Sequence, residues 1–197
     1  AAAKGPEDAV APVYNAAKDV YEISTPAQLM YLSGTWKEGA PRDGNYVLTA
    51  DIDMAGWEGF RPIASEKEEG YLGTFDGQYH VIRNLTIDYP KKYVGLFGYV
   101  GNENDQAYVK NVAMINCEIR GQQNVGGIAG TMGVENLLDP EEDNKDEGTS
   151  LLRTSYTVSA VLIGNINEGS ITAKKDMVGG ITAPRLNELI EQTIRVQ

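Results

Sequence analysis

The sequence predicts a mainly β fold in which repeated strand units stack on one another as a β-solenoid. The first observation is that three glycine-bearing segments, Val94–Gly98, Val125–Gly130 and Val178–Ile181, are copies of one unit. The first two segments lie about 30 residues apart, a spacing typical of stacked repeats. A unit of this size holds only short strands, which bury their apolar faces when the next unit stacks on them.

The second observation is that strand-like stretches precede these segments. Residues 48–54 alternate apolar and polar side chains, which is the periodicity of a strand. Residues 84–87 and 111–114 are corresponding stretches, and each begins with an asparagine. Asparagine tolerates the left-handed conformation, so we expect it at an equivalent corner of each layer, bonded to its neighbour. The glycines permit tight corners and close approach of successive layers.

A short helix is predicted near the start of the solenoid. Ser24 and Thr25 are hydroxyl residues that precede Pro26, and Gly34 follows the apolar run. This pattern is typical of a helix with a capped start and a defined end. The Ala-rich residues 1–19 contain two prolines and predict a tail or a weak helix.

The last part of the chain changes period, which completes the predicted domain organisation. Residues 184–197 carry apolar side chains at helical spacing and predict a helix that caps the open end of the solenoid. The solenoid domain then spans residues 20–183, with an acidic insertion at residues 135–148. The insertion is a solvated loop or a calcium loop, although it lacks the ligand spacing of an EF-hand.

The composition excludes several classes of function. The net charge of −11 and the pI of about 4.6 argue against nucleic acid and anionic membranes as partners. No run of eighteen apolar residues exists, so we expect no membrane insertion. The chain begins at Ala1 without a methionine or a signal peptide, as a processed or trimmed chain would. The one cysteine, Cys117, cannot form an internal disulfide and is expected to be a buried, inert side chain.

Little in the sequence points to catalysis. His80 is the one histidine, so the paired histidines of a zinc-peptidase helix are excluded. A Ser-His-Asp triad would need His80 with Ser65 and Asp76, its neighbours in sequence, but no nucleophile elbow is present. Asp51 and Asp53 project from one side of a strand, where they bind calcium or a sugar or simply face water.

Aromatic residues are concentrated in the first half of the chain and leave two interpretations open. An exposed strip would stack on sugar rings or anchor a protein partner. Alternatively, the rings pack over the N-terminal end of the solenoid, where an apolar column would otherwise meet water. The candidate residues for a ligand surface are Trp57, Phe60, Tyr71 and Tyr79.

The glycine segments resemble the GLUG motif, a repeat of adhesin-like bacterial surface proteins. Residues 95–98 (Gly-Leu-Phe-Gly) match the motif in form, and residues 127–130 (Gly-Ile-Ala-Gly) are a close variant. The third copy, residues 180–183, departs from the motif because it ends in Ala183. Upstream, three stretches resemble the entry helix, the following strand and the turn of these modules, in the same order: residues 23–29, 48–54 and 73–85.

The resemblance covers about residues 21–183 and implies a right-handed parallel β-helix on an exported bacterial protein. It implies an extracellular or cell-surface location and a non-enzymatic, adhesin-like role as a binding module or scaffold, without a cofactor. The implied partner is a surface protein or glycan of the host or the bacterium. Two alternatives stay open, because a fold does not define a function. One is a polysaccharide-degrading lyase or glycosidase, and the other is a purely structural spacer.

Overall fold

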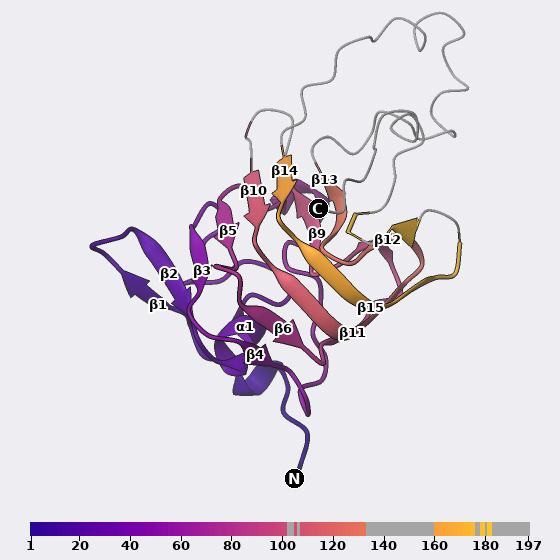
Figure 1. Ribbon diagram of the computed structural model, residues 1–197, viewed down its shortest axis with the longest axis horizontal. Coiled ribbons are helices and arrows are strands. Elements are labelled where there is room, and N and C mark those ends of the chain that lie inside the picture. The colour runs from indigo at the N-terminus through magenta and orange to yellow at the C-terminus, as the bar shows by residue number, and fades with distance from the viewer. Residues whose placement is uncertain (102–104, 106, 133–159, 176–177, 180, 183–197) are drawn as a thin grey trace, which may run out of the picture.

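The computed structural model describes residues 1–101, 105, 107–132, 160–175, 178–179 and 181–182 (Figure 1). Strands dominate this part of the chain, and its helices are short: η1 (Pro6–Asp8), α1 (Pro26–Tyr31) and η2 (Lys67–Glu69). The first strands are β1 (Val13–Asn15), β2 (Val20–Ile23), β3 (Tyr46–Leu48), β4 (Ile52–Asp53), β5 (Thr74–Asp76), β6 (Val81–Arg83), β7 (Thr86–Asp88), β8 (Lys92–Val94) and β9 (Phe97–Val100). The later strands are β10 (Ala107–Lys110), β11 (Ala113–Gly121), β12 (Gln123–Gly126), β13 (Ala129–Met132), β14 (Ala160–Ile163), β15 (Ile166–Ala173) and β16 (Val178–Gly179).

Within the described residues, the strands form four sheets. Their orders are β1-β2-β3-β5-β10-β14, β15-β11-β6-β4, β16-β12-β8 and β13-β9, and β7 also pairs with β11. The pairs are parallel except for β1 with β2, which is antiparallel. The expectation of a mainly β chain with parallel pairing is therefore confirmed.

The chain visits these sheets in the same order each time. One segment runs through β5, β6, β7, β8 and β9, the next through β10, β11, β12 and β13, and the next through β14, β15 and β16. Each strand pairs with its equivalent in the neighbouring segment, as β11 and β15 do side by side in Figure 1. Isolated bridges extend the pairing between strands, since Ile63 pairs with Phe97 and Tyr71 with Val100.

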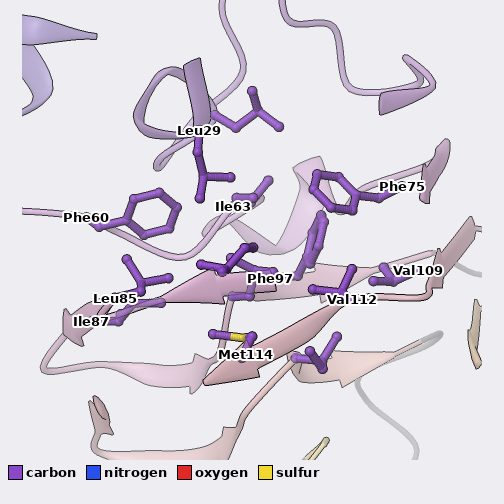
Figure 2. Close-up of a cluster of buried hydrophobic side chains, with 14 of the residues drawn as sticks. Leu29, Phe60, Ile63, Phe75, Leu85, Ile87, Phe97, Val109, Val112 and Met114 are labelled. Carbon is purple, nitrogen blue, oxygen red and sulfur yellow. The ribbon is translucent and has the colours of Figure 1, made fainter. Parts of the chain in front are cut away.

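The apolar core follows from this pairing, because equivalent side chains of successive segments point inward together. Each of these inward-pointing side chains has at most 1% of its surface exposed. Burying one apolar side chain of this size contributes about 1.5–3 kcal/mol to stability. Figure 2 shows part of the cluster, with Leu29 of α1 on one side and Met114 of β11 on the other. The stacked pairs include Phe75 with Val109, Ile82 with Met114, Ile87 with Ile119, and Val94 with Val125.

The predicted N-terminal helix is confirmed as α1. Thr25 precedes it in extended conformation, and its Oγ1 accepts a hydrogen bond from the Gln28 N–H at 3.2 Å. The Gln28 side chain accepts in return from the Ser24 N–H at 2.8 Å, so two amides at the helix start are satisfied. Leu29 and Met30 are buried, and α1 contacts β4.

Residues 1–19 differ from the expected tail or weak α-helix. They hold η1 and the strand β1, which forms an antiparallel hairpin with β2. The cause is local, because Asn15 Oδ1 accepts hydrogen bonds from the Ala17 and Lys18 amides and fixes the turn. Pro6 and Pro12 also divide the alanines into runs too short for a stable helix.

Asparagines form hydrogen-bonded corners between layers, as expected, but the predicted correspondence was wrong. Asn116 Nδ2 donates to Asn84 Oδ1 at 2.7 Å, and Asn84 Nδ2 donates to Asp53 Oδ1 at 2.9 Å. Both asparagines have a positive φ, 59° for Asn84 and 53° for Asn116. Asn111 lies at a different corner and donates to Asp76 at 3.3 Å. The register pairs β6 and β7 with β11, so Asn84 meets Asn116 instead of Asn111.

The predicted capping helix at residues 184–197 and the acidic insertion at residues 135–148 lie outside the described residues. In the part of the chain that is described, no helix is long and apolar enough to span a membrane.

Replacing Gly130 with alanine is expected to destabilise the protein by about 3 kcal/mol or more. The added Cβ would lie 2.2 Å from the Tyr93 carbonyl carbon, which is backbone of the neighbouring layer. Gly56→Ala is the control, since its Cβ meets nothing within 4 Å and only the φ of 78° is strained. That control should cost about 1 kcal/mol in urea unfolding. Equal losses in the two variants would contradict the close approach of layers.

Replacing Asn84 with alanine should cost about 2 kcal/mol in the same measurement. The variant loses the hydrogen bonds to Asp53 and Asn116 and places an ordinary side chain at positive φ. Asn84→Gly loses the same hydrogen bonds but tolerates the φ, so it should recover about half of the loss. An alanine variant as stable as the parent would show that the corner contributes nothing.

Candidate ligand-binding groove

A groove of about 710 Å³ lies where the loop after β4 meets the segment around β7. It is lined by residues 54–61 and 84–91, which belong to successive layers of the fold. Its volume is in the range of small-molecule and oligosaccharide sites. Its aromatic and charged lining residues include Trp57, Glu58, Arg61, Asp88, Tyr89 and Lys91.

The first half of the loop at residues 54–61 is held by backbone hydrogen bonds to β6 and to the N-terminal segment. The Met54 N–H donates to the Arg83 carbonyl at 2.8 Å, so the loop leaves β4 in register with β6. Lys4 then pairs with the loop, since its N–H donates to the Gly56 carbonyl at 2.9 Å and its carbonyl accepts from the Glu58 N–H at 2.8 Å. The N-terminal segment thus fixes this wall of the groove.

The other wall is fixed by the next layer. The Tyr89 N–H donates to the Arg120 carbonyl at 3.0 Å, and the Lys91 carbonyl accepts from the Gln122 N–H at 2.8 Å. Both walls are therefore held in place before any ligand arrives, which lowers the entropic cost of binding.

Two aromatic rings in the groove each carry an ammonium group. Lys4 Nζ lies 5.7 Å from the centroid of the half-buried Trp57 ring. Lys91 Nζ lies 5.5 Å from the centroid of Tyr89, which is 7% exposed. Both distances are those of cation–π contacts, which restrict where each ammonium sits. Of these two lysines only Lys91 lines the groove, and the exposed Arg61 is the second cation of its lining.

The four aromatic residues predicted for a ligand surface do not form one strip. Trp57 and Phe60 both line the groove, but Phe60 is only 2% exposed. Tyr71 is fully buried and cannot contact a ligand. Tyr79 is 82% exposed on the turn between β5 and β6, and it does not line the groove. Trp57 is the one of the four that both lines the groove and is partly exposed.

Tyr71 is buried because other aromatic rings surround it and its hydroxyl finds a partner inside the protein. Its ring centroid lies 5.2 Å from that of Phe97, 5.7 Å from Trp36 and 6.0 Å from Tyr46. Its hydroxyl donates to the Gly44 carbonyl at 2.8 Å, so the polar end is satisfied inside. These rings pack on one another in the interior, whereas the packing alternative placed them over the N-terminal end of the solenoid.

Sequence reasoning missed the charged part of the groove. Arg61 and Lys91 stand in unrelated stretches of sequence, and only the parallel register brings them to one site. The offset between β4 and β6, which aligns residues 52–53 with residues 82–83, is the feature that could have predicted this. Applying that offset to the loops would have placed the two stretches side by side.

Asp51 and Asp53 behave as the simpler interpretation predicts. Both side chains face solvent, while Ile52 and Met54 between and beyond them are 1% exposed. A strand that alternates in this way buries its apolar residues and leaves the carboxylates outside.

The pKa values of both carboxyl groups are lowered. For Asp51 the main cause is the hydrogen bond from the Val81 N–H, 2.9 Å from Oδ1. For Asp53 the main cause of the lowered pKa is the hydrogen bond from the Asn84 side chain, and the second is the hydrogen bond from the Ala55 N–H. A glycosidase acid needs a raised pKa, so these groups suit permanent carboxylates that organise the corners.

His80 does not assemble the triad considered from sequence. Its Nδ1 lies 3.3 Å from Asp51 Oδ1, so its carboxylate neighbour is Asp51 and not Asp76. Asp76 Oδ1 instead accepts from the Gln78 N–H at 2.9 Å and from Asn111. These contacts make His80 part of a corner network.

Among the described residues, no group of three or more His, Cys, Asp or Glu side chains could hold a metal ion. The calcium candidate at residues 135–148 lies outside them. Cys117 is 2% exposed, and burial raises the pKa of its thiol. An inert structural cysteine is expected to look like this.

Comparisons with known proteins give limited matches. No protein-family model matches the chain. An alignment of 123 residues, covering 56% of this chain, is 38% identical to Halomucin of Haloquadratum walsbyi (strain DSM 16790 / HBSQ001), and the matched region spans 1% of Halomucin. A candidate immunoglobulin A1 protease from Bacteroides ovatus has a TM-score of 0.48 and 23% identity, covering 77% of this chain and 38% of that one. Structural overlap of this extent carries no conclusion about activity.

The lowered pKa of Asp51 predicts a pH-dependent contribution to stability. Because the folded value lies below the ordinary value of 3.8, the contribution is present above that pH and is lost as pH falls through the folded pKa. Asp51→Asn should therefore be less stable than the parent at pH 7, and the gap should narrow below about pH 4. Urea unfolding at pH 7, 4 and 3 measures this. A gap that stays constant with pH would show that ionisation of Asp51 plays no part.

Proposed function

We propose that this chain is a non-enzymatic binding or scaffold module of a surface-associated or secreted protein, and that the groove is its ligand surface. The observation that carries the proposal is the groove itself, whose walls are fixed by backbone hydrogen bonds to neighbouring layers. Its exposed lining combines the partly exposed ring of Trp57 with charged side chains. Such a surface suits recognition without chemistry, for which no cofactor is needed.

A location outside the cell or at its surface belongs to the same proposal. The similarity to Halomucin, a mucin by name, supports it. Since the match spans 1% of that protein, only the module is compared and not the activity of the whole. The proposed partner is a protein or glycan on a host or bacterial surface.

We also propose that the sheets form a right-handed parallel β-helix of the GLUG-motif type. The support is the repeated order of strands and the parallel, in-register pairing of each segment with the next. The glycine segments fall at equivalent places, since β9 pairs with β13 and β8 with β12. In such stacked folds, loops at the corners vary while the layers stay regular.

Two alternatives make different predictions. A polysaccharide lyase or glycosidase would cleave its ligand, and Asp51→Ala or Asp53→Ala would abolish the cleavage. A pure spacer would bind nothing. The lowered pKa values of Asp51 and Asp53 argue against these two groups as the acid of a glycosidase.

Trp57→Ala is expected to weaken ligand binding at least about tenfold, because hot-spot aromatic residues contribute 1.4 kcal/mol or more. The chain would be screened against arrays of host and bacterial glycans and matrix proteins, and affinity for each hit would be measured by calorimetry. Tyr79→Ala is the matched control, an exposed aromatic residue outside the groove. Hits that depend on Tyr79 and not on Trp57 would overturn the groove as the ligand surface, and an array without hits would overturn the binding function.

A further inference from the structure

We propose that two copies of this chain associate through the free edge of β1, strand against strand about a two-fold axis. The contact is separate from the groove and adds a partner, a second copy, to the binding or scaffold role proposed above. It follows from the place of β1 in its sheet, from the direction of its backbone groups, and from the side chains that it exposes.

β1 is an end strand of its sheet. Among the described strands it pairs with β2 alone, and the β1–β2 hairpin extends away from the stacked layers (Figure 1). Side chains of the hairpin hold it together: Tyr14 Oη donates to Asp19 Oδ1 at 2.7 Å. Asn15 Nδ2 donates to Glu22 Oε1 at 3.0 Å. The edge is therefore held in shape before a partner arrives, which lowers the entropic cost of association.

The backbone groups of Tyr14 point to this open edge. Its partner on β2 is Tyr21, whose N–H donates to the Asn45 carbonyl at 2.7 Å, on the side of β3. Opposite residues of an antiparallel pair turn their backbone groups either toward each other or away from each other. Since Tyr21 faces β3, Tyr14 turns its N–H and its carbonyl away from β2. A second copy of the same strand, related by a two-fold axis, satisfies this donor and this acceptor reciprocally.

The aromatic column of the core reaches the surface at β1. The parallel and antiparallel registers place four rings in one row, those of Phe75, Tyr46, Tyr21 and Tyr14. Successive centroids lie 6.4 Å, 5.3 Å and 4.9 Å apart. Tyr46 is fully buried, whereas Tyr14 is 50% exposed. In the two-fold pair, Tyr14 lies opposite Tyr14 of the second copy on the same face, so the aromatic packing continues across the contact.

The absence of charge along this segment suits a second copy of the chain. Residues 9–17 carry no charged side chain, although the net charge of the chain is −11. Natural sheet edges are commonly protected by charged side chains, but this segment instead exposes Val10, Val13 and Tyr14. Two such strands meet without like charges directly opposite each other, and the remaining repulsion comes from more distant carboxylates. Added salt should therefore strengthen the association, because it screens that repulsion.

Sedimentation of the full chain over a concentration series tests the contact. A short strand buries less than the roughly 800 Å² per partner of a stable interface, so we expect a weak monomer–dimer equilibrium that is detectable by about 1 mM protein. Tyr14→Pro removes the edge N–H without taking a backbone hydrogen bond from the hairpin. Tyr14→Ala is its matched comparator, since both variants lack the ring. The proline variant should dimerise at least about tenfold more weakly than the alanine variant, because two hydrogen bonds are lost per dimer.

Two further variants separate the contact from effects on folding. Tyr14→Lys keeps the N–H but places two ammonium groups opposite each other, so it should also weaken the dimer relative to Tyr14→Ala. Tyr79→Lys changes an exposed tyrosine on another turn and should dimerise as the parent does. If the proline variant does not melt as the alanine variant does, the lysine variant decides.

An engineered disulfide tests the two-fold geometry. Opposite residues in such a pair lie about 5.5 Å apart between Cα atoms, within the range that a disulfide bridges. Tyr14→Cys should therefore cross-link to its own copy when oxidised with diamide, as measured by non-reducing electrophoresis. Tyr79→Cys, equally accessible but away from the edge, should cross-link more slowly. The native Cys117 is 2% exposed and is common to both variants.

Several results would overturn the proposal. A chain that stays monomeric at every concentration would do so, as would association that weakens when salt is added. Variants of Tyr14 that all dimerise like the alanine variant would show that the edge of β1 is not the contact. Larger oligomers in which Tyr14→Cys does not cross-link would mean that β1 docks on a different edge of the next copy. Ligand binding by the groove is measured on separate variants, so none of these results bears on the proposed function.

Discussion

Backbone hydrogen bonds between equivalent strands of successive segments hold the described part of the chain together. They require the segments to approach closely, and glycines make this approach feasible. A Cβ at Gly130 would lie 2.2 Å from the Tyr93 carbonyl carbon, and one at Gly73 would lie 2.1 Å from the Gly44 carbonyl oxygen. Once the strands pair, register is fixed, because a slip of one residue would turn every inward side chain outward. The apolar columns and the asparagine corners both follow from that register.

The groove also depends on the register of the paired strands. Its two walls come from different layers, and neither wall alone contains both Arg61 and Lys91. The loop at residues 54–61 interrupts the strand pattern and is hydrogen-bonded to Lys4 and to Arg83 at the end of β6. Met54 and Phe60 of this loop stay in the core, while Glu58 and Arg61 are exposed. The binding surface proposed above therefore does not interrupt the core.

Sequence reasoning succeeded where local rules decide the outcome. The helix at residues 26–31 follows from its cap, its proline and its terminal glycine, and the burial of Ile52 and Met54 follows from alternation. It failed where long-range register decides. Asn84 and Asn111 both begin an apolar stretch, so spacing alone could not show that Asn116 is the true partner of Asn84. Tyr71 carries no local mark of burial, and the groups that enclose it, among them Phe97 and the Gly44 carbonyl, come from distant parts of the sequence.

The pairing of Asp88 with Arg120 shows how register also sets the charge of the groove. Asp88 belongs to β7 and Arg120 to β11, and the two are directly opposite each other in the parallel ladder. Arg120 is shared between two carboxylates, because its Nη2 also contacts Glu118 on the same strand. The lining itself carries two cations, Arg61 and Lys91, and two carboxylates, Glu58 and Asp88. The ladder that stabilises the layers therefore also decides which charges remain available to a ligand.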